Sequence, residues 1–97
     1  MSAQRLSKGV QMATYFVYVL KSLKDEKFYT GHTADLKRRL KQHNGGRVRS
    51  TKARRPFELV YWEPLETRRE AMLRERELKS LRRAEKLKLI QAPKQSP

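Results

Sequence analysis

Two segments of the chain have the apolar pattern that predicts β-strands, the first as a continuous run and the second with alternating polar positions. Residues 14–21 (TYFVYVLK) and 57–63 (FELVYWE) are rich in aromatic and β-branched residues, which favour strands. Pro64 is expected to close the second segment, because proline cannot donate to a strand ladder. Alternation in the first segment assigns alternate residues to opposite faces: Phe16, Tyr18 and Leu20 to one, and Tyr15, Val17 and Val19 to the other.

A shorter strand is predicted at residues 27–30. The polar residues 22–26 before it are typical of a turn, so the first two strands should form an antiparallel hairpin. Gly31 is expected to end this strand, because glycine lets the backbone turn or approach another group closely.

Leucines at helical spacing predict a helix after the hairpin. Thr33 is the expected N-cap, and Leu36 and Leu40 form the buried stripe. The helix should end at about His43, because residues 44–46 (NGG) terminate it. The polar, basic segment that follows is expected to be a loop until the strand at residue 57.

Two further helices are predicted in the last third of the chain. Residues 67–70 (TRRE) form a capping box, in which the threonine caps the first turn and the glutamate reaches back. This helix should run to about Leu81, with Ala71 and Leu78 on its buried side. A shorter amphipathic helix is predicted over residues 83–91.

The element order β-β-α-β-α-α predicts an α+β fold, a small three-stranded antiparallel sheet flanked by helices. A chain of 97 residues with 37% hydrophobic content suits one domain with a modest core. We expect this domain at residues 13–91, a flexible leader at residues 1–12 and a disordered tail at residues 92–97.

Composition excludes several other classes of protein. The chain has no cysteine, which rules out a disulfide framework or a thiolate zinc site. No apolar run approaches the ~20 residues of a membrane span, and the leader lacks the apolar stretch of a secretory signal. We therefore expect a cytoplasmic protein without a membrane partner.

The net charge of +14 is the strongest compositional signal, and it is unevenly distributed. Residues 37–55 contain nine lysines and arginines and no acid. Such a segment is either a solvated basic face, a membrane-surface patch or a nucleic-acid contact. It lacks the apolar helical stripe of an interfacial helix, so nucleic acid is favoured.

Arg39 and His43 are one helical turn apart and share an edge of the first helix, beside its leucine stripe. A guanidinium in this position can hold a phosphate through two parallel hydrogen bonds. From the helix alone, however, the favoured reading of Arg39 is one more solvated charge among many. His43 is in turn either a catalytic side chain or a histidine with an ordinary hydrogen bond at the core boundary.

Glu75 lies on the core-facing side of the capped helix, four residues after Ala71 and three before Leu78. A carboxylate in this position is costly unless a cation or hydrogen-bond donors meet it. It therefore either pairs with an arginine such as Arg39 or binds a metal. One carboxylate is enough for Mg²⁺, which usually keeps several of its waters.

Tyr18 and Tyr29, eleven positions apart, lie on the two strands of the predicted hairpin. Tyrosine is common in strands, so both rings can serve packing alone. In an antiparallel hairpin, however, the two side chains can be neighbours, and with Arg39 they would form a polar cluster.

The stretches FVYVL, FYTGHTADLKRRLKQHN and EAMLRERELK together resemble the GIY-YIG endonuclease superfamily. The likeness is to its small stand-alone bacterial members, whose pattern continues through STKARRPFELVYWE and LRRAEKLKLI, and to the nuclease domain of the nucleotide-excision-repair incision subunit. It spans about residues 13–90. Phe16 stands where the first motif has glycine, Thr30 replaces the central isoleucine of the second, and an asparagine found in larger members has no counterpart near Leu87.

The resemblance implies a metal-dependent endonuclease that leaves 5′-phosphate and 3′-hydroxyl ends. Tyr18 and Tyr29 match the tyrosines of the two motifs. Arg39 matches the active-site arginine, Glu75 the metal-binding glutamate, and His43 a histidine or tyrosine of many members. Glu75 would then hold one Mg²⁺ or Mn²⁺ and Arg39 would stabilise the transition state. Tyr18 is the first choice to accept the proton of the attacking water, with Tyr29 or His43 orienting that water.

The basic segment would contact the DNA backbone. Its expected contact residues are Lys37, Arg38, Lys41, Asn44, Arg47, Arg49, Ser50, Thr51, Lys52, Arg54 and Arg55. Backbone contacts set register without reading sequence, so we expect selectivity for strand or branched structure, as in DNA repair. Tyr61 and Trp62 either stack on bases or pack within the strand faces.

Two other readings compete with the nuclease. One is a catalytically silent nucleic-acid-binding protein of the same fold, although the presence of all five candidate residues favours an enzyme. The other is a basic structural module in which Glu75 is only salt-bridged.

Overall fold

The computed structural model describes residues 15–91. The leader predicted at residues 1–12 and the tail predicted at residues 92–97 lie outside this range. Within it, none of the helices has the length and apolar character needed to cross a bilayer.

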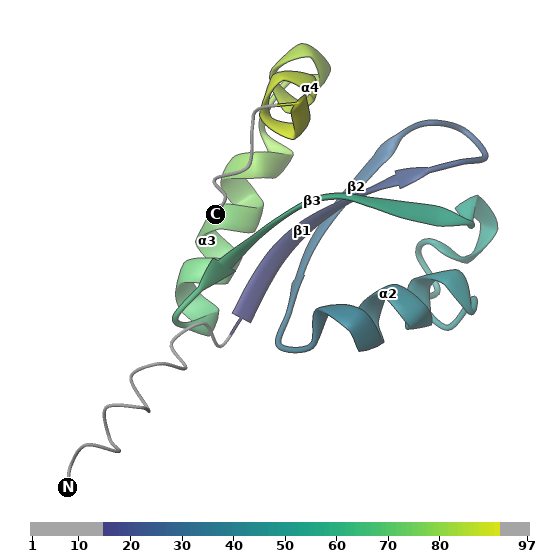
Figure 1. The fold of residues 1–97 in the computed structure, drawn as a ribbon, viewed down its shortest axis with the longest axis horizontal. Coiled ribbons are helices and arrows are strands. Elements are labelled where there is room, and N and C mark those ends of the chain that lie inside the picture. Colours follow the sequence, from purple (N-terminus) through teal and green to yellow (C-terminus); the bar gives the residue numbers. More distant parts are fainter. Residues whose placement is uncertain (1–14, 92–97) are drawn as a thin grey trace, which may run out of the picture.

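The predicted α+β architecture is confirmed (Figure 1). Three antiparallel strands form one sheet in the order β2-β1-β3. The strands are β1 (Tyr15–Ser22), β2 (Phe28–Thr33) and β3 (Phe57–Leu65). The helices are α2 (Leu36–Asn44), α3 (Arg68–Lys79) and α4 (Arg83–Gln91), and the predicted loop contains one short 3₁₀ turn, η1 (Lys52–Arg54).

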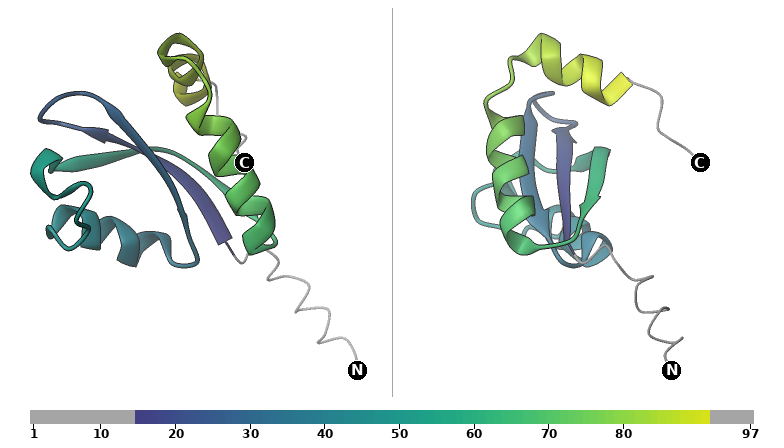
Figure 2. Two further views of the ribbon diagram at one scale, coloured as in Figure 1. Left: turned by 180° about the vertical axis from the view of Figure 1, so that it is seen from behind. Right: turned by 90° about the vertical axis from the view of Figure 1, so that its left-hand side faces the viewer.

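Helices cover the two faces of the twisted sheet from opposite sides (Figures 1 and 2). On one face Val17 and Val19 of β1 pack against Leu78 of α3, with partly buried side chains from α4 around them. On the other face Tyr18 and Leu20 pack with Phe57 and with the leucine stripe of α2. The central strand β1 is therefore buried on both sides, and the alternation predicted from its sequence is confirmed.

The prediction that Gly31 ends the second strand is wrong. β2 continues to Thr33, and Gly31 pairs with Tyr18 in the ladder. A Cβ atom at Gly31 would lie 2.6 Å from the Tyr18 hydroxyl oxygen. Glycine is needed here because the tyrosine ring lies against the backbone of β2, and not because the chain turns.

Two other boundaries also differ from the prediction. The N-cap of α2 is Asp35 rather than Thr33, because the Asp35 carboxylate accepts from the Arg38 amide at 3.0 Å. Pro64 lies within β3 instead of closing it, which is tolerated because β3 is an edge strand. The Thr67 cap of α3 is confirmed, although Glu70 reaches back to the Glu66 amide.

A charged contact fixes α3 on the sheet. Arg74 donates to both carboxylate oxygens of Glu63 on β3, at 2.8 to 3.1 Å. Tyr61 donates to the same carboxylate, and burial together with that carboxylate raises the pKa of Tyr61 to about 12. Because Glu75 follows Arg74 directly, this contact also sets the direction in which Glu75 projects.

Thr30 provides a test of this packing. Its side-chain oxygen is buried and, within the described residues, has no hydrogen-bond partner. Thr30→Val should therefore raise the free energy of unfolding by about 1 kcal/mol, seen as a higher Tm. Thr51→Val is the matched control, because the Thr51 hydroxyl is hydrogen-bonded and its loss should destabilise the fold. Equal changes in Tm for the two substitutions would contradict the prediction that, of these two hydroxyls, only that of Thr30 lacks a hydrogen bond within the described residues.

Candidate active site

Tyr18 is at the centre of the candidate site, with only 1% of its surface exposed. Its ring lies against Gly31, and its hydroxyl lies 3.0 Å from Nε2 of His43. β1 supplies the tyrosine and the last turn of α2 supplies the histidine. The sequence therefore joins these elements through a buried polar contact as well as through apolar packing.

His43 is also fully buried, and its second ring nitrogen is engaged. Nδ1 lies 2.8 Å from the Thr51 hydroxyl, which in turn donates to the Val48 carbonyl oxygen at 3.4 Å. Because Thr51 donates onward, the network assigns the proton to Nδ1 and leaves Nε2 to accept from Tyr18. Burial, and then the charge of Arg39, lower the pKa of His43 to about 4, so the ring is neutral at pH 7.

Arg39 lies beside this pair, half-buried, and donates to the Gln42 side chain at 3.0 Å. Burial raises the pKa of the Tyr18 hydroxyl above its ordinary value, and a hydrogen bond with Arg39 offsets part of that shift. Arg39 also lines an open pocket of about 350 Å³ together with His32 and Arg38. The guanidinium is thus placed between the tyrosine and a space that a phosphate can enter.

Tyr29 completes the group on this face of the sheet. Its ring centroid lies 6.5 Å from that of Tyr18 and 5.1 Å from that of His43. The two tyrosines are diagonal neighbours, because Tyr29 pairs with Leu20 in the ladder. The expectation that they lie close together across the hairpin is confirmed.

Glu75 approaches from the opposite face, on α3. Its carboxylate is bonded to Nδ1 of His32 at 2.5 Å and to Nζ of Lys79 at 2.7 Å. Burial acts to raise the pKa of Glu75, but these two hydrogen bonds outweigh it and the pKa lies below its ordinary value. The expected alternative, a pair with Arg39, is not formed. Glu75 is linked to the pocket beside Arg39 through His32, which bonds its carboxylate and lines that pocket.

His32 is a site residue that the sequence prediction missed. It pairs with Val17 and therefore projects to the α3 face, where it meets Glu75. Extending the second strand past Gly31 would have placed it there by alternation. The sequence signal was present, but it was hidden by the assumption that glycine ends the strand.

Glu75 fits a metal that needs few protein ligands. Across residues 15–91, no three His, Cys, Asp or Glu side chains gather into a metal-binding cluster. The Lys79 ammonium already holds a positive charge against Glu75, on a side chain that is 56% exposed and free to move aside. A single carboxylate that exchanges Lys79 for a hydrated ion matches the way proteins bind Mg²⁺.

Most of the predicted nucleic-acid contacts lie on the surface. The exposed members are Lys37, Arg38, Lys41, Asn44, Arg47, Arg49, Ser50, Lys52 and Arg55. Arg38, Lys41 and Arg47 line a second open pocket, of about 510 Å³. This surface continues from the pocket beside Arg39, because Arg38 lines both.

Three of the predicted contacts have side chains that are already bonded within the fold. Thr51 is completely buried against His43 and cannot reach a phosphate. The Asn44 amide bonds both backbone groups of Phe57, at 2.6 and 3.1 Å, and so joins α2 to β3. Arg54 is paired with Asp25 at 3.1 Å. The expectation for Thr51 is corrected by its burial, and the other two side chains already have partners.

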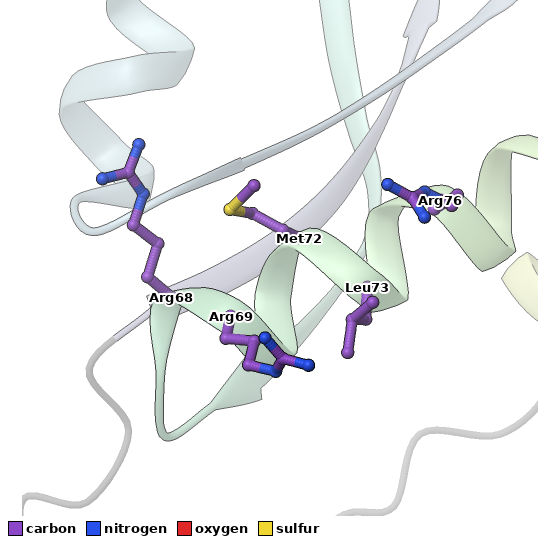
Figure 3. Close-up of a pocket in the computed structure, with 5 residues that line it drawn as sticks. All are labelled: Arg68, Arg69, Met72, Leu73 and Arg76. Carbon is purple, nitrogen blue, oxygen red and sulfur yellow. The ribbon is translucent and has the colours of Figure 1, made fainter.

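A larger open pocket, of about 560 Å³, lies on α3 (Figure 3). It is lined by Arg68, Arg69, Met72, Leu73 and Arg76. Its lining contains no acid, histidine or tyrosine, so it lacks the side-chain types of the candidate site.

Comparison with known proteins shows the family of this chain. The sequence model of the family described as the GIY-YIG catalytic domain matches residues 14–88, and the chain therefore belongs to the GIY-YIG family. The UPF0213 protein of Staphylococcus haemolyticus is 44% identical over 81 residues, covering 82% of this chain and 98% of that protein. A UPF0213 protein of Staphylococcus epidermidis is 46% identical over 81 residues, with the same two shares. The resemblance to small stand-alone GIY-YIG proteins is confirmed.

A solved structure supports the fold as well. The solution NMR structure of a UPF0213 protein from Bacillus halodurans is 40% identical and matches with a TM-score of 0.50. The match covers 78% of this chain and 81% of that one. The GIY-YIG family is a nuclease family.

Burial of neutral His43 predicts a pH dependence of stability. Its pKa is 6.5 in the unfolded chain and about 4 when folded, so the unfolded chain binds more protons between these values. The free energy of unfolding should have its full value above pH 6.5. It should fall as the pH drops toward 4, by up to about 3 kcal/mol. Urea unfolding at pH 5 to 7 measures this slope.

The chain has only two histidines, which gives a matched control for that measurement. His43→Gln should remove the slope between pH 5 and 7, while His32→Gln should keep it. A slope that survives in His43→Gln and disappears in His32→Gln would contradict this prediction, because it would assign the pH dependence to His32.

Proposed function

We propose that this protein is a metal-dependent endonuclease that hydrolyses phosphodiester bonds in DNA, with selectivity for strand or branched structure rather than for sequence. The observation that carries this proposal is the contact between the Tyr18 hydroxyl and neutral His43, with Arg39 beside it. This contact fixes both the hydroxyl proton and the direction of the oxygen lone pairs. A structural tyrosine would need neither the adjacent guanidinium nor the pocket beside it.

The tyrosine and histidine act together on the attacking water. Tyr18 donates its proton toward His43 Nε2, which leaves a lone pair on its oxygen able to accept from a water that enters beside Arg39. As the water oxygen bonds to phosphorus, its proton passes to Tyr18 and the tyrosine proton passes to His43. The bond from phosphorus to the 3′ oxygen breaks, and that oxygen leaves with a proton from solvent. Buried His43 therefore acts through Tyr18 rather than on the water itself.

Arg39 and Glu75 deal with the charge of the phosphate. The Arg39 guanidinium can donate two parallel hydrogen bonds to the non-bridging oxygens, where charge grows in the transition state. Glu75 would hold the Mg²⁺ or Mn²⁺, which when bound stabilises charge on a non-bridging oxygen and on the leaving oxygen. Tyr29 adjoins both Tyr18 and His43 and helps to orient the water.

The exposed basic residues of α2 and the following loop would bind the backbone around the scissile phosphate. Arg38 lines both the pocket beside Arg39 and the second pocket, which also contains Lys41 and Arg47, so it links the two pockets. Contacts of this kind neutralise phosphates and release counterions without reading bases. They suit a nuclease whose selectivity depends on strand geometry.

One observation favours a second function. Both carboxylate oxygens of Glu75 already have cationic or hydrogen-bonding partners, His32 and Lys79. A protein in which that contact persists would bind nucleic acid through the basic surface without cutting it. A cleavage assay distinguishes the two functions, whereas a binding assay does not, because both proteins would bind nucleic acid.

Glu75→Gln tests the enzyme. The substitution should lower the cleavage rate by about 10²-fold or more in Mg²⁺ or Mn²⁺, because the carboxylate that holds the metal is lost. Binding should be kept or strengthened, since one negative charge is removed. Cleavage of labelled single-stranded, duplex and forked DNA measures the rate, and binding of the same DNA in EDTA measures the affinity.

Glu77→Gln is the control, because it makes the same change on the same helix at a side chain that is 66% exposed. It should cut like the wild-type protein. Wild-type cleavage rates in Glu75→Gln would exclude its role as metal ligand. Salt-sensitive binding without cleavage by the wild-type protein would establish the silent binder instead.

The basic surface makes a separate prediction. Arg38→Ala and Arg47→Ala should each reduce the slope of log Kd against log salt concentration by about 1, as expected for the loss of one phosphate contact. Lys88→Ala removes the same charge from α4 and should leave the slope unchanged. A uniform change in all three variants would point to net charge alone.

A further inference from the structure

We propose that His32 is a positioning residue of the metal site, which holds the Glu75 carboxylate in place for the divalent ion, and that Lys79 is the partner which the ion displaces. The inference rests on the proposed function, because it assigns roles to the two side chains that contact the proposed metal ligand. Neither His32 nor Lys79 was among the site residues predicted from the sequence.

His32 reaches Glu75 from a fixed place in the sheet. Its backbone pairs with Val17 of β1, so its side chain projects toward α3, and Nδ1 lies 2.5 Å from Oε1 of Glu75. The imidazole is short and planar, and only 25% of the side chain is exposed. The strand therefore sets the direction from which the carboxylate is held.

The contact also assigns the proton of the histidine. Burial acts to raise the pKa of Glu75, and the hydrogen bond with His32 is the largest of the effects that outweigh burial and lower it. The carboxylate is therefore ionised at neutral pH, and an ionised carboxylate can only accept hydrogen bonds. Nδ1 of His32 must be the donor, so the histidine keeps Glu75 in the charged form that a cation needs.

His32 also joins the two halves of the candidate site. β2 is an edge strand, and near its end His32 lines the open pocket that contains Arg39. A phosphate bound by Arg39 would lie in the same pocket as the imidazole that holds Glu75. This placement suits an ion that contacts both a carboxylate and a phosphate oxygen. A contact that served only to join β2 to α3 would not need to reach that pocket.

Lys79 is bonded to the other carboxylate oxygen in a looser way. Its ammonium lies 2.7 Å from Oε2 of Glu75, four residues away on the same helix, and the side chain is 56% exposed. α3 ends at Lys79, so this side chain can turn into solvent without disturbing a further helical turn. Exposed ion pairs at this spacing contribute little to stability. Lys79 is therefore the partner that leaves, and it keeps Glu75 paired when no ion is bound.

Binding of Mn²⁺ to the full chain tests the role of His32 without cleavage. Electron paramagnetic resonance would measure free Mn²⁺ as protein is added in the absence of DNA, with Glu75→Gln as the reference for loss of the ligand. His32→Ala should weaken Mn²⁺ binding by about tenfold or more, as is typical when the hydrogen-bond partner of a metal ligand is removed. His32→Asn should restore most of the affinity, because its amide nitrogen is attached at the position of Nδ1 and can donate to the carboxylate.

Lys79 should act in the opposite direction. Lys79→Met should strengthen Mn²⁺ binding by about threefold, since the ion no longer competes with the ammonium. Arg76→Met is the control, because it removes a positive charge from the same helix at a residue that lines the separate pocket on α3. It should change the affinity less. In cleavage assays, the Mn²⁺ concentration that gives the half-maximal rate should rise in His32→Ala and fall in Lys79→Met.

Wild-type Mn²⁺ affinity in His32→Ala, with or without a lower Tm, would show that the contact serves packing alone and would overturn the proposal. Equal losses of affinity in His32→Ala and His32→Asn would also overturn it, as would unchanged or weaker binding in Lys79→Met. The proposed function fails separately, if Glu75→Gln binds Mn²⁺ like the wild-type protein or if the wild-type protein binds none. Loss of Mn²⁺ binding in Glu75→Gln, with no effect of the other variants, would keep the metal site and remove only the roles inferred for its partners.

Discussion

The candidate site depends on the position of one side chain, Tyr18, held between the backbone of Gly31 and the ring of His43. The bare glycine lets the ring lie against β2, and the histidine fixes the hydroxyl from α2. His43 is itself held by Thr51 in the segment before β3. A slip of one residue in the β1–β2 register would send Tyr18 to the other face and dissolve the whole arrangement.

This contact also explains how a small basic domain keeps polar groups inside its core. Tyr18 and His43 are buried in neutral forms and satisfy each other, so neither brings an unpaired charge into the core. Arg39 stays at the boundary, where its charge acts on the tyrosine while its guanidinium lines the pocket. The excess positive charge lies on exposed side chains, where solvent screens its repulsion.

Local pattern was enough to predict the fold and the faces of its elements. Alternation in β1 and the spacing of Ala71 and Leu78 depend on neighbouring residues alone, and both predictions are confirmed. The closeness of Tyr18 and Tyr29 followed from pairing two strands. What the sequence could not supply were contacts between distant segments. His32 meets Glu75 across 43 positions and Asn44 meets Phe57 across 13, and local pattern can give the face of such a side chain but not its distant partner.

The two halves of the site belong to two separate apolar clusters, one on each face of the sheet. The tyrosine, histidine and arginine side is built on Leu20, Phe57 and α2, whereas Glu75 comes from the helix that packs on Val17 and Val19. Substitutions can therefore accumulate in one half without disturbing the packing of the other. If the proposed roles hold, a descendant that lost the carboxylate would inherit the Tyr18, His43 and Arg39 half intact, which gives evolution a short route from a cutting protein to a purely binding one.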